Sequence, residues 1–233
     1  MANTESKRRG LTRAAIVARA LDVGGAEGLE AVSLRRLALE LGVTPMALYR
    51  HVSDKQDLIN AMTDEVLAGF DLSDGMSPSM SWQDRVRLAI TNFKKQMEAR
   101  PLALPLSIAY TGEGAAGFWR MSETLLAILL DAGFERRRAI VWIRVISNLL
   151  SGYLLLISQD AAAMAQLDDA RQLEVLRKRF ELVLLGLPAA EFPTLTASSA
   201  VMPEVWLSNP DQYWTDTVDL LVLGLEAMLA RER

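Results

Sequence analysis

The stretch that decides the fold is SLRRLALELGVTPMALYRHVSDK, residues Ser33 to Lys55. Its first part predicts an amphipathic helix, because leucine and alanine recur at the i, i+3, i+4 and i+7 positions that share one helix face. Gly42 can adopt the left-handed backbone conformation that ends such a helix. Thr44 can then cap a second helix, and Pro45 fits its first position. Two short helices around a glycine turn, with the second one displayed, form a helix-turn-helix.

The second helix has a single apolar edge, formed by Leu48 and Val52. Side chains off that edge are free to face outward, where they would meet a partner rather than the core. These outward positions are Met46, Ala47, Tyr49 and Arg50.

The residues of this stretch resemble the N-terminal domain of the TetR family of bacterial transcription regulators. The resemblance covers roughly residues 11–68 and is looser afterwards. The Leu48–Val52 ending is similar to the tetracycline-repressor branch of that family. The matching motifs are Leu37-Ala38, Leu41-Gly42-Val43, Leu48-Tyr49-Arg50-His51-Val52 and Lys55.

The resemblance implies a DNA-binding surface on the helix-turn-helix. Arg35 and Arg50 are the candidates for guanine contacts, because an arginine can bind O6 and N7 together. Base edges or thymine methyl groups are expected to meet Pro45, Met46 and Ala47, while Thr44, Tyr49, His51 and Lys55 position the domain on phosphates. Ser33, which caps the first helix, completes the predicted DNA-binding set.

Composition and charge limit the class of protein. The chain has 233 residues, 51% of them hydrophobic, which is enough for one large or two modest domains. It has no cysteine and one histidine, which argues against disulfides, thiol chemistry and a zinc site, and agrees with a cytoplasmic location. No signal peptide is expected, because the first residues contain no apolar run. The net charge is −4, yet residues 1–60 carry nine basic against seven acidic side chains, as phosphate contacts would require.

The chain reads as helices throughout, so we predict an all-α fold with two domains. Residues 1–70 form the predicted DNA-binding domain, which has a polar tail at 1–10 and a fourth helix at 54–70 as connector. The tail is either disordered or an arm that touches DNA. Residues 71–79 are a linker, and residues 80–233 are the predicted all-helical regulatory and dimerisation domain.

Several local features are expected along the chain. The glycines at 24, 25 and 28 should break it after a first helix that runs from Leu11 to about Gly25. Further helices are predicted at 82–99, 118–132, 135–159, 167–185 and 211–231. Residues 102–110 should be a short apolar piece interrupted by Pro105, residues 112–117 should be loose, and residues 186–209 should be mostly loop.

The helices at 135–159 and 211–231 are apolar around most of their circumference. The uncharged run 145–157 is shorter than the ~20 residues that span a bilayer, so no membrane segment is predicted. Such helices must be covered on several sides. The family resemblance implies that they pair with a second copy, as a homodimer that binds an inverted-repeat operator. Gly152 and Gly224 would permit close approach there, or are incidental.

Aromatic and methionine side chains in the regulatory domain are either plain core or the lining of a pocket for a small effector. The resemblance favours a pocket, and hence a repressor that a small, largely apolar ligand releases from DNA. Tetracycline is not expected, because this part of the chain has no histidine for its magnesium site. The predicted lining is Phe93, Met97, Tyr110, Phe118, Trp119, Trp142, Tyr153 and Phe180.

Two rival functions are considered. One is a DNA-binding regulator or architectural protein that a protein partner controls, with no small-molecule ligand. The other is an enzyme or carrier with a vestigial DNA-binding domain. His51, the only histidine, lies in the predicted DNA-reading stretch, and no nucleotide-binding glycine motif is present. We therefore expect no enzyme activity, no cofactor and no metal site.

Overall fold

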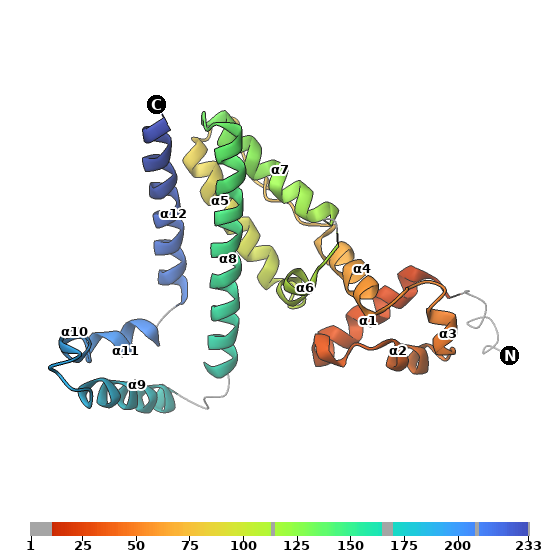
Figure 1. Ribbon diagram of the computed structural model, residues 1–233, viewed down its shortest axis with the longest axis horizontal. Coiled ribbons are helices and arrows are strands. Elements are labelled where there is room, and N and C mark those ends of the chain that lie inside the picture. Colours follow the sequence, from red (N-terminus) through yellow and green to blue (C-terminus); the bar gives the residue numbers. More distant parts are fainter. Residues whose placement is uncertain (1–10, 113–114, 165–169, 208–209, 233) are drawn as a thin grey trace. The chain divides into compact units, whose positions relative to one another are not determined.

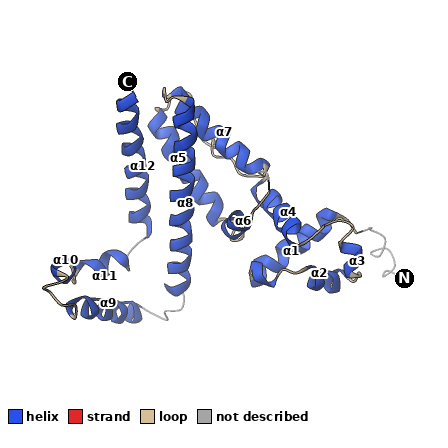
Figure 2. Ribbon diagram, in the orientation of Figure 1, coloured by secondary structure: helices blue, strands red, loops and turns tan. Residues whose placement is uncertain are grey.

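The computed structural model describes residues 11–112, 115–164, 170–207 and 210–232, which form helices joined by short connections (Figures 1 and 2). No strand occurs within these ranges. The predicted all-α fold class is therefore confirmed. The tail at residues 1–10, with its possible contact to DNA, lies outside the described residues.

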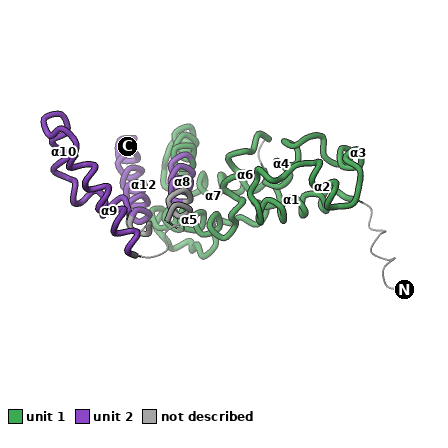
Figure 3. Tube along the Cα trace, turned by 90° about the horizontal axis from the view of Figure 1, so that it is seen from below, with its two compact units in different colours: residues 1–147 green, residues 148–233 purple. Residues whose placement is uncertain are grey.

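Two compact units divide the chain, residues 1–147 and residues 148–233 (Figure 3). The division falls within a single long helix. The boundary that the sequence predicts between a DNA-binding and a regulatory domain, at residues 70–80, is a different one and stays a prediction.

The first unit begins with five helical segments. Four of them are α-helices, and these helices with their connections are called the head below. The five segments are α1 (Arg13–Glu27), the 3-10 turn η2 (Leu29–Ala31), α2 (Leu34–Leu41), α3 (Pro45–Leu48) and α4 (Lys55–Leu67). Each α-helix starts behind a polar side chain that accepts a hydrogen bond from the backbone N–H three residues further on, which satisfies one exposed donor of the first turn. These caps are Thr12, Ser33, Thr44 and Asp54.

One apolar core holds the head together. Each of its four α-helices contributes at least one fully buried side chain, such as Ile16, Leu37, Leu48 and Met62. Leu106, from further along the chain, joins the same cluster. Burial of one such side chain stabilises a fold by about 1.5–3 kcal/mol, so this cluster stabilises the head substantially.

Three further helices follow in the first unit, α5 (Trp82–Glu98), α6 (Ala103–Ala109) and α7 (Ala116–Asp131). The segment predicted as a linker at residues 71–79 is fastened to α5. The Asn92 amide nitrogen donates to the carbonyl oxygens of Leu72 at 3.1 Å and Asp74 at 2.9 Å. These two hydrogen bonds fix the path of the chain between α4 and α5.

The connector helix α4 packs against both α6 and α7. At its first turn, the Gln56 amide nitrogen donates to the carbonyl oxygen of Ala109 at 2.9 Å. At its last turn, Gly117 of α7 lies directly on the backbone of Leu67, where a Cβ atom on residue 117 would overlap the Leu67 carbonyl oxygen. Both ends of α4 are thus held by segments that follow it in the chain.

The second unit contains the end of α8 (Arg136–Met164) and the helices α9 (Ala170–Leu185), α10 (Pro193–Ala197), α11 (Val201–Trp206) and α12 (Pro210–Glu232). Within it, α9 packs against α10 and α11. The rings of Phe180 and Trp206 lie 5.7 Å apart, and those of Tyr153 and Trp214 lie 5.0 Å apart. Aromatic pairs therefore link α9 to α11 and α8 to α12.

Three local predictions are wrong. Gly24 and Gly25 do not break the chain, because α1 continues through them to Glu27 and ends at Gly28, whose φ is 88°. Pro105 does not interrupt residues 102–110, since it lies in the first turn of α6, where no intrahelical N–H bond is needed. The segment 186–209 contains α10 and α11, and each has a proline in its first turn. Of the segment expected to be loose, residues 113–114 lie outside the described part and α7 begins soon after them.

The stretch Arg136–Ile157 of α8 is long and apolar enough to cross a membrane, by length and composition only. The same composition is found in helices that pair in soluble bundles, so one such helix is weak evidence for a membrane span. In this structure, 17% of the most apolar part of the stretch is buried. Most of that part is therefore uncovered within the described chain.

Candidate nucleic-acid interface

The turn between α2 and α3 has the geometry that the sequence predicts. Gly42 adopts the left-handed conformation, with φ 67° and ψ 33°, and its N–H donates back to the end of α2. The Val43 N–H donates to the carbonyl oxygen of Ala38 at 2.9 Å. Thr44 then caps α3 and Pro45 occupies its first position. A left-handed glycine and a capped proline set the angle at which α3 leaves α2.

Buried and exposed side chains alternate sharply on α3 and the turn that follows it. Leu48 and Val52 lie in the core of the head, whereas Met46 is 70% exposed and Tyr49 is also exposed. The N–H groups of His51 and Val52 both donate to the carbonyl oxygen of Leu48. These bonds continue the helical path for part of a turn, so the residues at 49–51 are presented together with α3.

Three cations of the head have no partner to hold them. Arg35 on α2, Arg50 after α3 and Lys55 at the start of α4 are exposed, and they make no ion pair or hydrogen bond through their side chains in the part of the chain that the structure describes. Cations that are not paired within a protein are available for phosphate oxygens and guanine edges.

Arg36, next to Arg35 in the sequence, is committed in the opposite way. It forms a bidentate pair with Glu27, and its Nε atom donates to Glu40 at 2.9 Å. The hydrogen bonds that Arg36 donates to Glu27 and, second, to Glu40 raise the pKa of Arg36, and the same bonds lower the pKa of both carboxyl groups. Of the two neighbouring arginines, only Arg35 has a side chain without a partner among the described residues.

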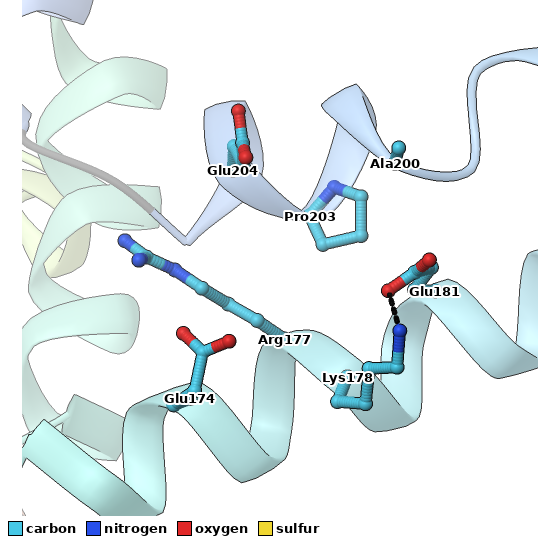
Figure 4. A pocket seen from close by; sticks show the side chains of 7 residues that line it. All are labelled: Glu174, Arg177, Lys178, Glu181, Ala200, Pro203 and Glu204. Atoms are coloured by element: carbon cyan, nitrogen blue, oxygen red, sulfur yellow. Dashed lines mark hydrogen bonds and ion pairs between the residues drawn. The ribbon is translucent and has the colours of Figure 1, made fainter.

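A shallow pocket of about 90 Å³ lies in the second unit, between α9 and the segment that begins α11 (Figure 4). Charged side chains dominate its lining, and Lys178 pairs with Glu181 at 2.8 Å. None of the predicted effector-binding residues belongs to it. Its lining is Glu174, Arg177, Lys178, Glu181, Ala200, Pro203 and Glu204.

Two family models match most of the chain. Residues 16–62 match the model of the bacterial regulatory proteins of the tetR family, and residues 75–229 match the tetracyclin repressor-like C-terminal domain.

The chain belongs to the TetR family.

This family consists of bacterial regulatory proteins, in agreement with the prediction from the sequence.

Individual relatives match parts of the chain. The class E tetracycline repressor protein of Escherichia coli is 30% identical over 140 residues, which cover 60% of this chain and 65% of the repressor. The transcriptional repressor DrrR1 of Streptomyces coeruleorubidus is 46% identical over 56 residues, 24% of this chain and 21% of that one. The chain thus spans less than two thirds of either relative.

Solved structures share the fold of this chain over 61–94% of its length. The Streptomyces coelicolor protein ActR in complex with actinorhodin superposes with a TM-score of 0.77 at 24% identity, covering 94% of this chain and 98% of ActR. BioQ with its double-stranded DNA operator superposes with a TM-score of 0.54 at 23% identity, covering 61% of this chain and 85% of BioQ. At these identities the likeness shows the fold alone.

The predicted DNA-binding residues lie on one continuous segment of this TetR-family head, from the start of α2 to the start of α4. Ser33 and Thr44 use their hydroxyl oxygens as acceptors in helix caps, which leaves each hydroxyl hydrogen free to donate. Ala47 and His51 are half-buried, and the others are exposed. Their contacts with DNA stay a prediction.

The predicted effector-binding residues are spread over several helices. Met97 on α5 is buried, whereas Trp119 on α7 is 62% exposed. The rings of Tyr110 and Phe118 lie 5.5 Å apart in the first unit. Half-buried positions are Phe93, Tyr110, Phe118, Trp142, Tyr153 and Phe180. Their role as a pocket lining stays a prediction.

Sequence reasoning missed the part that Arg13 plays in this region. Arg13 of α1 contacts Asp57 and the backbone of His51, which are 44 and 38 residues away. Spacing within one helix carries no signal for such a pair. A basic residue on an exposed face of α1 and an acidic one in the first turn of α4 were the only clues.

Proposed function

We propose that this chain is a homodimeric DNA-binding regulator, which represses transcription from a palindromic operator until a small, largely apolar ligand releases it. The observation that carries the proposal is the head itself. Its α2–Gly42–α3 geometry is capped at both helix starts, and it presents Arg35, Arg50 and Lys55 without side-chain partners among the described residues. Membership of the TetR family supports the same function, and a cytoplasmic location follows from it.

In this proposal, Arg35 and Arg50 bind guanine edges and Lys55 binds a phosphate. Met46 lies against base edges or thymine methyl groups, as its exposure allows. BioQ, which has the same fold, is known with its double-stranded operator bound, and that supports DNA as the partner of this head.

Exposed apolar side chains on α8 and α12 support the homodimer. On α12, Leu220 and Leu223 are 70% and 59% exposed, a large apolar area for a chain in water. Gly152 and Gly224 have nothing within 4 Å of an added Cβ atom, so a neighbouring helix could approach closely. The exposed apolar residues of α8 are Ile140, Val141, Val145, Leu149, Leu155 and Leu156.

The relatives support a small-molecule effector. ActR is known in complex with actinorhodin and with (S)-DNPA. In this chain, the indole N–H of Trp142 is buried and has no hydrogen-bond partner within the described structure. A buried donor left unpaired costs about 1–3 kcal/mol. A ligand with an aromatic or aliphatic body and one acceptor oxygen would satisfy it.

Release would work through α4. A ligand that binds better to one arrangement of the regulatory helices shifts the population toward that arrangement. Because α6 and α7 contact opposite ends of α4, such a shift would move α4, and the two recognition helices would no longer match the spacing of the operator.

Selection of bound duplexes from a random DNA pool tests the proposal. We expect an inverted repeat whose half-site centres lie about 10–10.5 base pairs apart. Compounds that raise the melting temperature in a screen of lipophilic and aromatic molecules should then weaken binding to that repeat. A pool that yields no enriched sequence would refute the proposed function.

A second candidate is a DNA-binding regulator that a protein partner controls, with no small ligand. The small, charged pocket beside α9 favours it, because an apolar molecule would gain little there. An enriched inverted repeat together with no stabilising compound in the screen would support this candidate over ligand release.

A further inference from the structure

We propose that Arg13 is a positioning residue for DNA recognition, which holds the segment Tyr49–Lys55 in the conformation that reads the operator. This inference rests on the proposed function of the head. Arg13 lies on α1, outside the helix-turn-helix, and nothing in the motif assigns it a role. Its guanidinium nevertheless reaches the turn between α3 and α4, which carries Arg50 and ends at Lys55.

The contacts of Arg13 join that segment, at His51, to the first turn of α4, at Asp57. Its Nη1 atom donates to the carbonyl oxygen of His51 at 2.7 Å and to Oδ2 of Asp57 at 3.0 Å. Its Nη2 atom donates to Oδ1 of Asp57. A guanidinium presents its donors in a fixed planar fork, so it fixes the distance between the His51 carbonyl and the Asp57 carboxylate.

Asp57 extends the same network to the other end of the turn. Its carboxylate also accepts a hydrogen bond from the Ser53 backbone N–H at 2.8 Å. The hydrogen bonds from Arg13, followed by the bond from Ser53, lower the pKa of Asp57 to about 2, against an opposing effect of burial. The carboxylate is therefore charged, and the network intact, at any pH near neutrality.

The backbone that this network holds is the backbone that aims the DNA-reading side chains. The His51 carbonyl is one residue from Arg50, and Ser53 is two residues before Lys55. A binding side chain must be held within about 0.5 Å of its productive position by the groups behind it. Within the part of the chain that the structure describes, the side chains of Arg50 and Lys55 have no partners, so the backbone that carries them sets their positions.

The head does not need Arg13 in order to fold. Leu48 and Val52 anchor the same segment from its apolar side and are almost fully buried. Arg19 provides a matched comparison, because it also lies on α1, is 43% exposed against 45% for Arg13, and pairs with a carboxylate, that of Glu40 at 2.7 Å. Arg19 contacts nothing between residues 49 and 55 in the described structure. Loss of Arg19 should therefore disturb stability alone.

The test uses the full chain and a duplex selected by the wild-type protein from a random pool. Arg13→Ala should weaken operator binding roughly tenfold, comparable with the loss of one base contact, and should change binding to an unrelated duplex of equal length by less than about threefold. Arg19→Ala should retain the wild-type affinity for both. Arg13→Lys keeps the charge but has a single nitrogen, so it should fall between wild type and Arg13→Ala. Circular dichroism checks that each variant is folded.

A double-mutant cycle with Arg50→Ala separates positioning from direct contact. If Arg13 acts through the segment, Arg13→Ala should cost much less affinity in the Arg50→Ala background than in the wild type. Additive losses, equal weakening on both duplexes with a reduced salt dependence, or full affinity of Arg13→Lys would each overturn the proposal. Failure of the wild-type protein to select any sequence would instead refute the proposed function, so the two failures are distinguishable.

Discussion

The head buries its large apolar side chains, whereas the second unit leaves several of them exposed. In the head, four capped helices close around one core that includes Ile16, Leu37 and Leu48, none of which is accessible to solvent. In the second unit, α12 leaves Leu220 and Leu223 mostly exposed. A large exposed apolar surface is unfavourable in water, and we propose that a second copy of the chain covers the one on α12.

The largest effect is expected from charge on that exposed surface. Replacement of both Leu220 and Leu223 by Glu should prevent pairing, because unpaired carboxylates are costly to bury. Each protein molecule would then reach one half-site only, and affinity for the full operator should fall by about a hundredfold or more. A gel shift on full and half operators measures the loss.

Leu182→Glu is the matched control, since Leu182 is a leucine on α9, not on α8 or α12, and is 57% exposed, close to the 59% of Leu223. It should leave operator affinity unchanged. Leu225 is a poor site for this experiment, because it is already buried within the chain and its replacement would test folding instead. Wild-type affinity in the double variant would remove α12 from the interface.

Two glycines contrast the packed and the open parts of the molecule. Gly117→Ala should lower the free energy of unfolding by about 1–3 kcal/mol, because its Cβ atom would meet the backbone of Leu67. Gly224→Ala has no such neighbour within the chain, and in an unpaired helix it should stabilise by up to about 1 kcal/mol. Urea denaturation compares the two.

If helices of two copies cross at Gly224, the alanine will instead weaken the dimer, and the denaturation midpoint will depend on protein concentration.

Equal stability of Gly117→Ala and the wild type would contradict the close contact between α4 and α7.

Replacement of Arg50 and of Lys55 should impair DNA binding in different ways. Arg50→Ala should relax the choice of base at one operator position, at a cost of about 1–3 kcal/mol there. Lys55→Ala should weaken binding to all sequences about equally. It should also make the binding constant depend less steeply on salt concentration, by about the amount expected for one phosphate contact. Binding measured on the operator and on its single-base variants, at several salt concentrations, separates the two. Uniform loss for Arg50→Ala would remove it from the base-reading residues.

The smallest effect concerns pH. The pKa of Asp57 is lowered to about 2, chiefly by its hydrogen bonds with Arg13, so its contribution to stability is fully present above the ordinary range near 4. That contribution should disappear as the pH falls from about 4 to 2, and it should not exceed about 1 kcal/mol because the pair is partly exposed. Asp57→Asn should therefore show a shallower acid-induced loss of stability than the wild type. Parallel curves for the two proteins would contradict this assignment.

Local features of the head could be predicted because they depend on neighbours in sequence. The caps at Ser33 and Thr44 and the turn at Gly42 each need only the adjacent residues. The sequence predicts Arg35 as a DNA contact, but it gives no sign that Arg36 is paired, because the partner Glu27 comes from α1, nine residues away. The pairing of Arg13 with Asp57 is still more remote.

The short helices α10 and α11 could not be predicted, because prolines between residues 186 and 209 indicate a loop as readily as the first turn of a short helix. In the structure, Pro193 and Pro203 lie in the first turns of the short helices α10 and α11. Which apolar helix faces meet a partner also depends on a surface that one chain does not contain.

The molar mass of the wild-type protein in solution tests most directly whether a second copy covers the exposed surface of α8 and α12. Light scattering coupled to size exclusion should give twice the chain mass of 25.7 kDa, and the variant carrying Leu220→Glu and Leu223→Glu should give the mass of one chain. A wild-type protein that elutes as a monomer, and that binds a single half-site as tightly as the full repeat, would contradict the proposed homodimer.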